Sequence, residues 1–208
     1  MDLGAHIGVF TILIINNMDD GLVLAVEPII YNYILAVNNI LNNAIKRNIK
    51  VKVVQKAIDI ADGVIKTLDW AGFRNYAESI SMNTLINIFE QKGYGEYIDL
   101  LKMDIEGAEY YLLTHDNQWL KRVKIIVGEL HPYVYGKTGL IKIYESLKSN
   151  GFRCFIVERR VPNLHYALSI VKNSNPYMVL FGVWRSLTAL FIPYVSLNYL
   201  YCVNLKMD

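Results

Sequence analysis

The chain has 208 residues and a mass of 23.9 kDa, a size that suits one domain with its own hydrophobic core. Its 21 Lys and Arg nearly balance its 19 Asp and Glu, and the basic residues form no block, so the composition excludes a large nucleic-acid-binding surface. Hydrophobic residues make up 53% of the chain and the mean hydropathy is +0.24, which is high for a water-soluble domain.

Hydrophobic periodicity predicts strands and helices that alternate along the chain, the pattern of a parallel sheet with crossover helices. The first strand falls at Met1 and is expected to be truncated. The later elements are expected, in chain order, as a helix over Val9–Ile15, a strand over Leu22–Val26, a helix after Pro28, a strand over Val51–Val54, a turn at Asp62 and Gly63, a helix over Thr84–Gln91, a strand over Tyr97–Leu101, a helical stretch over Tyr110–Leu113, a strand over Val123–Val127, a helix over Leu140–Ser149, and strands over Phe152–Val157 and Tyr177–Trp184. This order predicts an α/β fold with helices on both faces of the sheet.

The C-terminal part of the sequence is unusually apolar. We expect the domain to cover residues 1–184 and a tail to cover residues 185–208, because Ser186–Val203 carries no charge. The run is close to the length of a membrane helix, although Pro193 and several polar residues weaken that interpretation. The tail is therefore predicted either to associate with a membrane or to pack on the domain or on a partner. The sequence begins without a signal-peptide pattern.

The two cysteines, Cys154 and Cys202, lie in apolar surroundings and have neither C-x-x-C nor metal-ligand spacing. We therefore predict two buried free thiols, which fits a reducing compartment and a cytoplasmic protein.

The first motif is D-L-G-A-H-I-G, from Asp2 to Gly8. Gly4 and Gly8 allow a tight strand-to-helix turn and a close approach of the backbone to a ligand, and the helix that follows offers free N–H groups to an anion. An ordinary glycine turn without a ligand is the alternative. The G-x-G-x-x-G pattern of dinucleotide-binding proteins is absent from this segment.

The second motif is L-K-M-D-I-E-G-A-E, from Leu101 to Glu109, which follows an apolar run and turns on Gly107 into a helical pattern. Carboxylates in this position lie at the carboxyl edge of an open α/β sheet, where such folds bind their ligands. Glu106 and Glu109 are expected to be structural, pairing with Lys102 or with helix N–H groups.

Together with V-E-P at Val26–Pro28 and V-G-E-L-H at Val127–His131, these motifs resemble those of the FkbM family of S-adenosylmethionine-dependent methyltransferases. The resemblance covers about residues 1–133. It implies a Rossmann-like class I methyltransferase sheet with S-adenosylmethionine as the cofactor. The residues that it assigns to the cofactor are Asp2, Gly4, Ala5, His6, Gly8, Glu27, Asp59 and Asp104.

The resemblance also implies a role for each part of the cofactor site. The glycine turn would hold the methionine carboxylate, and Asp2 would face the ammonium group. Glu27 would accept hydrogen bonds from the ribose hydroxyls, although an acid at a helix N-terminus is the alternative. Asp59 would meet the adenine amino group, but the family more often has a small polar residue followed by Asp, whereas here Asp59 precedes Ile60.

Asp104, Glu129 and His131 are expected to be the catalytic residues. Methyl transfer needs alignment of the acceptor with the methyl group, and a hydroxyl acceptor also loses a proton to a base. Asp104 is the leading candidate for that base and His131 is the alternative. A divalent metal held by Asp104 with Glu129 or His131 stays open, although no ligand spacing demands one.

Methyltransferases that act on exocyclic amino groups usually carry Asn or Asp, Pro, Pro and an aromatic residue where this chain has D-I-E-G at residues 104–107. We therefore predict an O-methyltransferase that acts on a hydroxyl of a sugar, glycan or small metabolite, with Tyr133 and Tyr135 near enough to stack on a sugar ring. The alternatives are a cofactor-binding remnant or subunit without activity of its own, and a membrane-associated enzyme that acts on lipid-linked glycans.

Overall fold

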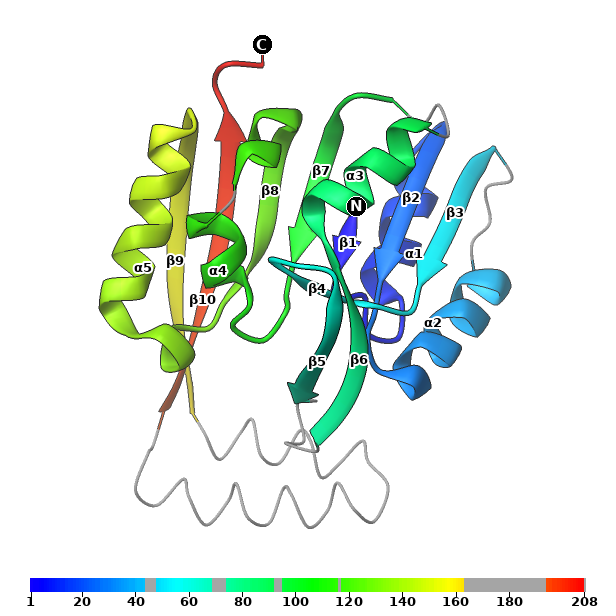
Figure 1. Cartoon of the computed structure of the whole chain (residues 1–208), viewed down its shortest axis with the longest axis horizontal. Coiled ribbons are helices and arrows are strands. Elements are labelled where there is room, and N and C mark those ends of the chain that lie inside the picture. Colours follow the sequence, from blue (N-terminus) through cyan, green and yellow to red (C-terminus); the bar gives the residue numbers. More distant parts are fainter. Residues whose placement is uncertain (44–47, 69–73, 92–94, 116, 163–193, 208) are drawn as a thin grey trace.

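The computed structural model describes the whole chain except residues 44–47, 69–73, 92–94, 116, 163–193 and 208. A seven-stranded sheet with the order β3-β2-β1-β7-β8-β10-β9 runs through the middle of the molecule (Figure 1). Strand β10 is antiparallel to both of its neighbours, and the pairs from β3 to β8 are parallel. The strands are β1 (Asp2–Leu3), β2 (Gly21–Val26), β3 (Ile49–Val54), β7 (Ile98–Met103), β8 (Val123–Leu130), β9 (Phe152–Pro162) and β10 (Tyr194–Asn204).

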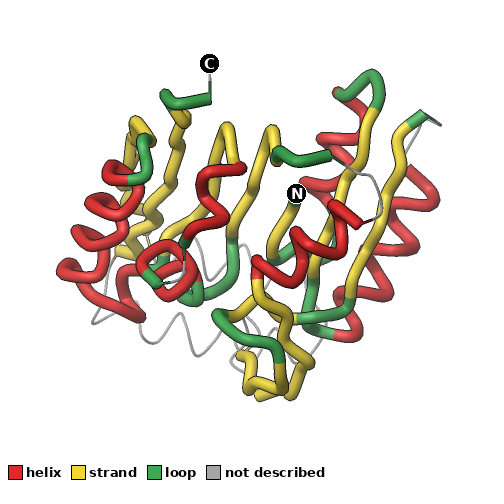
Figure 2. The backbone as a smooth tube through the Cα atoms, turned by 45° about the horizontal axis from the view of Figure 1, so that its top comes forward, coloured by secondary structure: helices red, strands yellow, loops and turns green. Residues whose placement is uncertain are grey.

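The helices cover both faces of this sheet, as the sequence predicts (Figure 2). The chain steps from β1 outward to β2 and β3, and later in the opposite direction from β7 to β8. Because parallel crossovers are right-handed, the helices of these two halves lie on opposite faces. The helices are α1 (Val9–Asn17) and α2 (Ile30–Asn43) in the first half, and α3 (Met82–Gln91), α4 (Glu109–Thr114), the short 3₁₀ helix η1 (Gln118–Arg122) and α5 (Pro132–Ser149) in the second.

The main core lies between the central strands and the helices of the second half. Strands β1, β7 and β8 contribute Leu3, Leu101 and Ile126, each of which is fully buried, and α5 contributes Ile143 and Leu147. Near-continuous burial is what a central parallel strand requires, since both of its faces are covered. The core therefore fixes the carboxyl ends of β1, β7 and β8 relative to one another.

A second sheet, with the order β4-β6-β5, is inserted between β3 and α3 (Figure 2). Its strands are β4 (Ala57–Asp59), β5 (Gly63–Leu68) and β6 (Arg74–Ser81). The sequence predicted only the turn at Asp62 in this region. Asp62 accepts hydrogen bonds from the Ser81 backbone N–H (2.7 Å) and the Thr84 hydroxyl (2.9 Å), so this turn is tied to the start of α3.

The last strand differs from the sequence prediction. The expected strand over Tyr177–Trp184 lies outside the described residues, whereas Tyr194–Asn204 forms β10 between β8 and β9. Tyr194–Asn204 of the predicted tail therefore lies in the sheet of the domain, as in the alternative in which the tail packs on the domain. Leu200 and Cys202 are buried, whereas Tyr199 and Tyr201 alternate with them on the opposite, more exposed face, a period of two that belongs to a strand. Among the described residues no helix is long and apolar enough to cross a bilayer.

The prediction of two free thiols is also wrong, because Cys154 and Cys202 form a disulfide. The antiparallel register of β9 and β10 places the two residues directly opposite each other, with their Cα atoms 4.1 Å apart. This pairing depends on a strand that the sequence analysis had placed elsewhere. The support that free thiols would have given to a reducing compartment is therefore lost.

We expect the disulfide to contribute to stability. It closes a loop with a sequence separation of 48, for which the loop-entropy model gives about 4 kcal/mol at most. Reduction with dithiothreitol, or the double substitution of Cys154 and Cys202 by Ser, should lower the free energy of unfolding by about 2–4 kcal/mol. Urea unfolding of oxidised and reduced protein measures this difference, and equal midpoints would contradict it.

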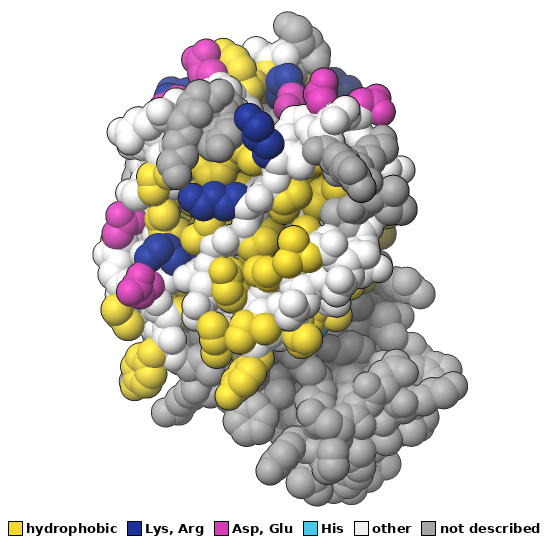
Figure 3. All heavy atoms as spheres, turned by 90° about the vertical axis from the view of Figure 1, so that its right-hand side faces the viewer, with side chains coloured by type: hydrophobic (Ala, Val, Ile, Leu, Met, Phe, Trp, Pro, Cys, Tyr) yellow, Lys and Arg dark blue, Asp and Glu magenta, His cyan; other side chains and the backbone are white. Residues whose placement is uncertain are grey.

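The helices of the first half leave apolar side chains on the surface. Leu13 of α1 is 56% exposed, and Ile34, Leu35 and Leu41 of α2 are also exposed. Figure 3, which looks at the side of the molecule where α2 and β3 lie, shows hydrophobic side chains gathered there. This surface contributes to the high mean hydropathy of the chain.

Candidate active site

The glycine turn joins β1 to α1 at the carboxyl edge of the sheet. The backbone N–H groups of Gly4 and Ala5 donate to the Val26 carbonyl at 2.9 and 3.0 Å. Gly4 has a φ of 76°, and a Cβ atom at this position would lie only 1.9 Å from the Asp104 carbonyl oxygen. The turn therefore passes so close to the end of β7 that only glycine fits.

Asp2 lies beneath this turn and is 1% exposed. Its Oδ2 accepts a hydrogen bond from the Thr11 hydroxyl at 2.6 Å. Its Oδ1 lies 3.3 Å from the Lys102 ammonium but has no hydrogen-bond partner among the described residues. The Lys102 ammonium directs a hydrogen bond at the Gly4 carbonyl instead (2.6 Å). One buried carboxylate oxygen thus stays available to a further donor.

Glu27 follows the end of β2 and is 4% exposed. It accepts hydrogen bonds from the His6 and Ile29 backbone N–H groups, both at 2.9 Å, and from the Asn32 amide at 3.3 Å. A carboxylate offers about four acceptor positions, so these donors leave roughly one for a ligand. Glu27 therefore fixes the glycine turn against the start of α2.

Asp59, the residue predicted to meet the adenine amino group, lies outside the glycine turn in the sequence. It ends β4 in the second sheet, and its carboxylate accepts a hydrogen bond from the Ile60 N–H at 2.7 Å. Among the described residues no hydrogen bond joins Asp59 to the glycine turn.

The carboxyl end of β7 forms the other side of the site. The chain leaves β7 at Met103 and turns through Glu106 and Gly107, which have φ values of 54° and 102°. The left-handed conformation of Glu106 is uncommon for a residue with a side chain and carries strain. The turn places Asp104 and Glu106 at the carboxyl edge of the sheet, opposite His131 at the end of β8. We call these three residues the lip.

Glu109 positions His131. Glu109 is fully buried, and its Oε1 accepts hydrogen bonds from the His131 backbone N–H (2.8 Å) and lies 2.9 Å from the His131 Nδ1. A proton therefore lies on Nδ1, and Nε2 points toward Asp104 and Glu106. There Nε2 lies 3.7 Å from Asp104 Oδ1 and 3.6 Å from Glu106 Oε2.

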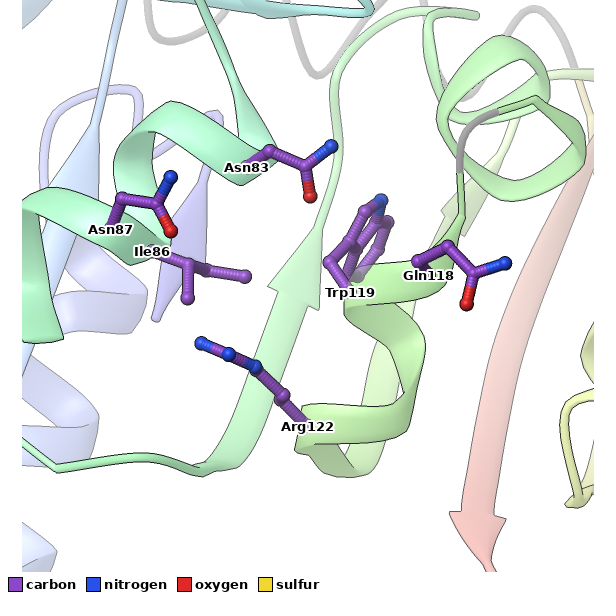
Figure 4. A pocket seen from close by; sticks show the side chains of 6 residues that line it. All are labelled: Asn83, Ile86, Asn87, Gln118, Trp119 and Arg122. Carbon is purple, nitrogen blue, oxygen red and sulfur yellow. The ribbon is translucent and has the colours of Figure 1, made fainter.

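The described residues also line a small pocket between α3 and η1, bounded by Asn83, Ile86, Trp119 and Arg122 among others (Figure 4). None of its lining residues belongs to the glycine turn or to the acidic lip. The predicted cofactor and catalytic residues therefore lie outside this pocket, at the glycine turn and the lip.

A family model described as the methyltransferase FkbM domain matches residues 2–154. The chain belongs to this family. The sequence resemblance to FkbM methyltransferases is thereby confirmed, and with it an S-adenosylmethionine-dependent methyltransferase domain of Rossmann-like fold. No curated protein matches the chain.

Several solved structures are similar to this FkbM domain. A protein of the NADB-Rossmann superfamily from Streptococcus agalactiae is 14% identical, with a TM-score of 0.48 over 100% of this chain and 62% of that one. An O-methyltransferase from Bacillus cereus in complex with SAH is 13% identical, with a TM-score of 0.49, over 96% and 71% of the two chains. The N-terminal domain of human METTL16 in complex with SAH is 14% identical, with a TM-score of 0.48, over 98% and 59%. The chain thus spans less than two thirds of the first and the last of these chains.

The residues of this FkbM domain fit S-adenosylmethionine. Asp2 Oδ1 is a buried carboxylate oxygen that accepts no hydrogen bond from the described residues, which suits it to an ammonium group. The glycine turn leads directly into α1, whose first turn offers backbone N–H groups to a carboxylate.

Sequence reasoning missed the two most informative partnerships of the FkbM domain. Glu109 was expected to be structural, and it does accept a hydrogen bond from the Gly107 N–H, but it also orients His131. Lys102 was expected to pair with Glu106 or Glu109, whereas its ion pairs are with Asp2 and Asp104. Both partnerships join residues from different elements, which no local pattern reports.

Electrostatics at the lip favour the charged form of the histidine. Burial lowers the pKa of His131, but the hydrogen bond to Glu109 and the charges of Glu109, Glu106 and Asp104 raise it, and the net pKa is about 9. Burial first, and then the charge of Asp104, raises the pKa of Glu129. Glu129 therefore belongs to the same electrostatic cluster as the other predicted catalytic residues.

We expect the stability of the FkbM domain to depend on pH through His131. The pKa of this residue is raised from 6.5 to about 9 in the folded state, so its stabilisation is fully present below pH 6.5 and is lost as the pH rises through 9. The difference in free energy of unfolding between wild type and His131→Gln, measured by urea unfolding in metal-free buffer, should fall by on the order of 2 kcal/mol from pH 6 to pH 9.5. Taking the difference between the two proteins cancels the contributions of the other titrating groups. A difference that does not depend on pH would refute the raised pKa of His131.

Proposed function

We propose that this chain is an O-methyltransferase that transfers the methyl group of S-adenosylmethionine to a hydroxyl of a sugar, glycan or small metabolite. The observation that carries the proposal is the position of Asp104 and His131 Nε2 side by side in the lip. The buried Glu109 holds the His131 ring in place. A hydroxyl acceptor needs a nearby group that can take its proton, and this lip offers Asp104, and His131 when its imidazole is neutral.

The reaction is a displacement in which the hydroxyl oxygen forms a bond to the methyl carbon while the carbon–sulfur bond breaks. S-adenosylmethionine supplies the sulfonium, whose sulfur keeps the electron pair of the broken bond. The protein aligns the acceptor oxygen, and Asp104 accepts the hydroxyl proton, with the neutral form of His131 as the alternative base. Glu109 keeps the His131 ring oriented and stabilises its positive charge, so it acts as a positioning residue.

The acceptor side of the lip carries aromatic rings. Tyr133 is 75% exposed, and its hydroxyl donates to Glu106 Oε2 at 3.0 Å, so its ring is fixed at the rim. Tyr135 stacks on Tyr110 and its hydroxyl lies 3.3 Å from Glu109, so it supports the site from below. The exposed ring of Tyr133 therefore suits stacking on a sugar, whereas Tyr135 has a structural role.

The test is transfer of a labelled methyl group to matched acceptors. A sugar, its deoxy analogue and its amino analogue should be compared under the same conditions, and only the sugar with the hydroxyl should accept the label. The product should be a methyl ether, which survives mild base, whereas a methyl ester does not. Transfer to the amino analogue in preference to the hydroxyl, or a product that is lost in base, would overturn the proposal.

A further inference from the structure

Three potential metal ligands converge at the lip. The carboxylate oxygens of Asp104 and Glu106 and the Nε2 of His131 all lie within 4.8 Å of one another. Nε2 is 3.7 Å from Asp104 Oδ1 and 3.6 Å from Glu106 Oε2, too far for a hydrogen bond with either. Ligands around a cation with bonds of about 2.1 Å lie roughly 3.0–3.4 Å apart, so a small closure of the carboxylates would complete a site.

His131 supplies an observation that is independent of the acidic residues. Only 5% of it is exposed, and its Nε2 lies beyond hydrogen-bond distance of the Asp104 and Glu106 carboxylates that it faces. Its Nδ1, in contrast, is held at 2.9 Å by the fully buried Glu109. This is the arrangement of a metal-binding histidine, in which a carboxylate on one ring nitrogen orients the other nitrogen toward the metal.

The charges and the backbone at the lip are consistent with a bound cation. Asp104 and Glu106 bring two negative charges together, and the nearest lysine, Lys102, lies 3.8 Å from Asp104 and is shared with Asp2. Glu106 has a left-handed backbone, and its Oε2, the oxygen that faces His131 Nε2, accepts a hydrogen bond from the Tyr133 hydroxyl.

We infer that Asp104, Glu106 and His131 bind one divalent cation of the Mn²⁺ or Mg²⁺ type. Two carboxylates and one neutral imidazole suit such a cation, which would displace the proton from Nε2 to solvent and keep its remaining positions for water or another oxygen ligand. What the cation does rests on the proposed function: at this lip it would contact the acceptor hydroxyl and lower its pKa. Its binding does not depend on that function.

The experiment is a titration of the metal-free full chain with Mn²⁺ alone, without cofactor or acceptor. Electron paramagnetic resonance counts the bound ions, and electron spin echo modulation detects an imidazole nitrogen coordinated to Mn²⁺. We expect one saturable site with a nitrogen signal. Glu106→Gln and His131→Gln should each weaken binding at least tenfold, and His131→Gln should also remove the nitrogen signal.

Asp99→Asn is the matched control, because it removes an exposed carboxylate from β7 that pairs with Lys124, away from the lip. It should bind Mn²⁺ like wild type. Glu106 is 46% exposed in its side chain, so Glu106→Gln keeps the test valid even if His131→Gln fails to fold. Absence of a saturable site, wild-type binding by Glu106→Gln, or a spectrum without the nitrogen signal would each overturn the inference. Failure of hydroxyl methylation with intact Mn²⁺ binding would overturn the proposed function alone.

Discussion

Gly4→Ala is expected to abolish binding of S-adenosylhomocysteine, with a loss of affinity of at least a hundredfold. The added Cβ atom would lie 1.9 Å from the Asp104 carbonyl oxygen, so the turn must move away from the end of β7. The backbone N–H groups and the Asp2 carboxylate would then lose their common geometry. Isothermal titration calorimetry measures the affinity, and micromolar binding by wild type would correspond to about 8 kcal/mol.

Gly136→Ala is the matched control for this prediction. Gly136 has a φ of 69°, close to the 76° of Gly4, but a Cβ atom there would have no neighbour within 4 Å. Gly136→Ala also strains the backbone, since Gly136 lies at φ 69° and ψ 178°, but only Gly4→Ala adds the collision. Circular dichroism should show that both variants are folded. Wild-type affinity in folded Gly4→Ala would refute the assignment of the glycine turn to the cofactor.

Asp104→Asn is expected to reduce methyl transfer by about 10²–10⁴, the usual effect of removing a positioned base, while cofactor affinity changes only a few-fold. The amide keeps the shape of the side chain but loses the charge that faces His131 Nε2 at 3.7 Å. Single-turnover rates with a hydroxyl acceptor, measured beside calorimetric affinities, separate the two effects. Full turnover by this variant would show that Asp104 is not catalytic.

Two further measurements distinguish the role of Asp104 from the role of His131 and from that of a bound cation. His131→Gln should have the smaller effect if Asp104 is the base, and an equal or larger effect if His131 is. Loss of activity in EDTA, with the folds of both variants intact, would assign Asp104 to holding a cation. Asp99→Asn, which changes an exposed carboxylate of the same strand, should retain wild-type turnover.

The sequence by itself was sufficient for the parts of this protein that depend on local order. The alternation of buried strands and amphipathic helices predicted β2, β3, β7 and β8 within a few residues, because periodicity reports which face of an element is buried. The glycine turn was equally clear, because its positive φ angles restrict the residue type at Gly4 and Gly8. Asp104 could be placed at the end of β7 because a carboxylate after an apolar strand must emerge at the edge of the sheet.

The tertiary structure alone decided which distant residues meet. Cys154 faces Cys202 because of the register of β9 with β10, and the charge-free segment that contains Cys202 resembled a membrane tail until its pairing partners were known. Glu109 reaches His131 across 22 residues, and Lys102 pairs with Asp2 rather than with Glu106. Such choices depend on strand order and register, which are set by the burial of whole faces and leave no local signal in the sequence.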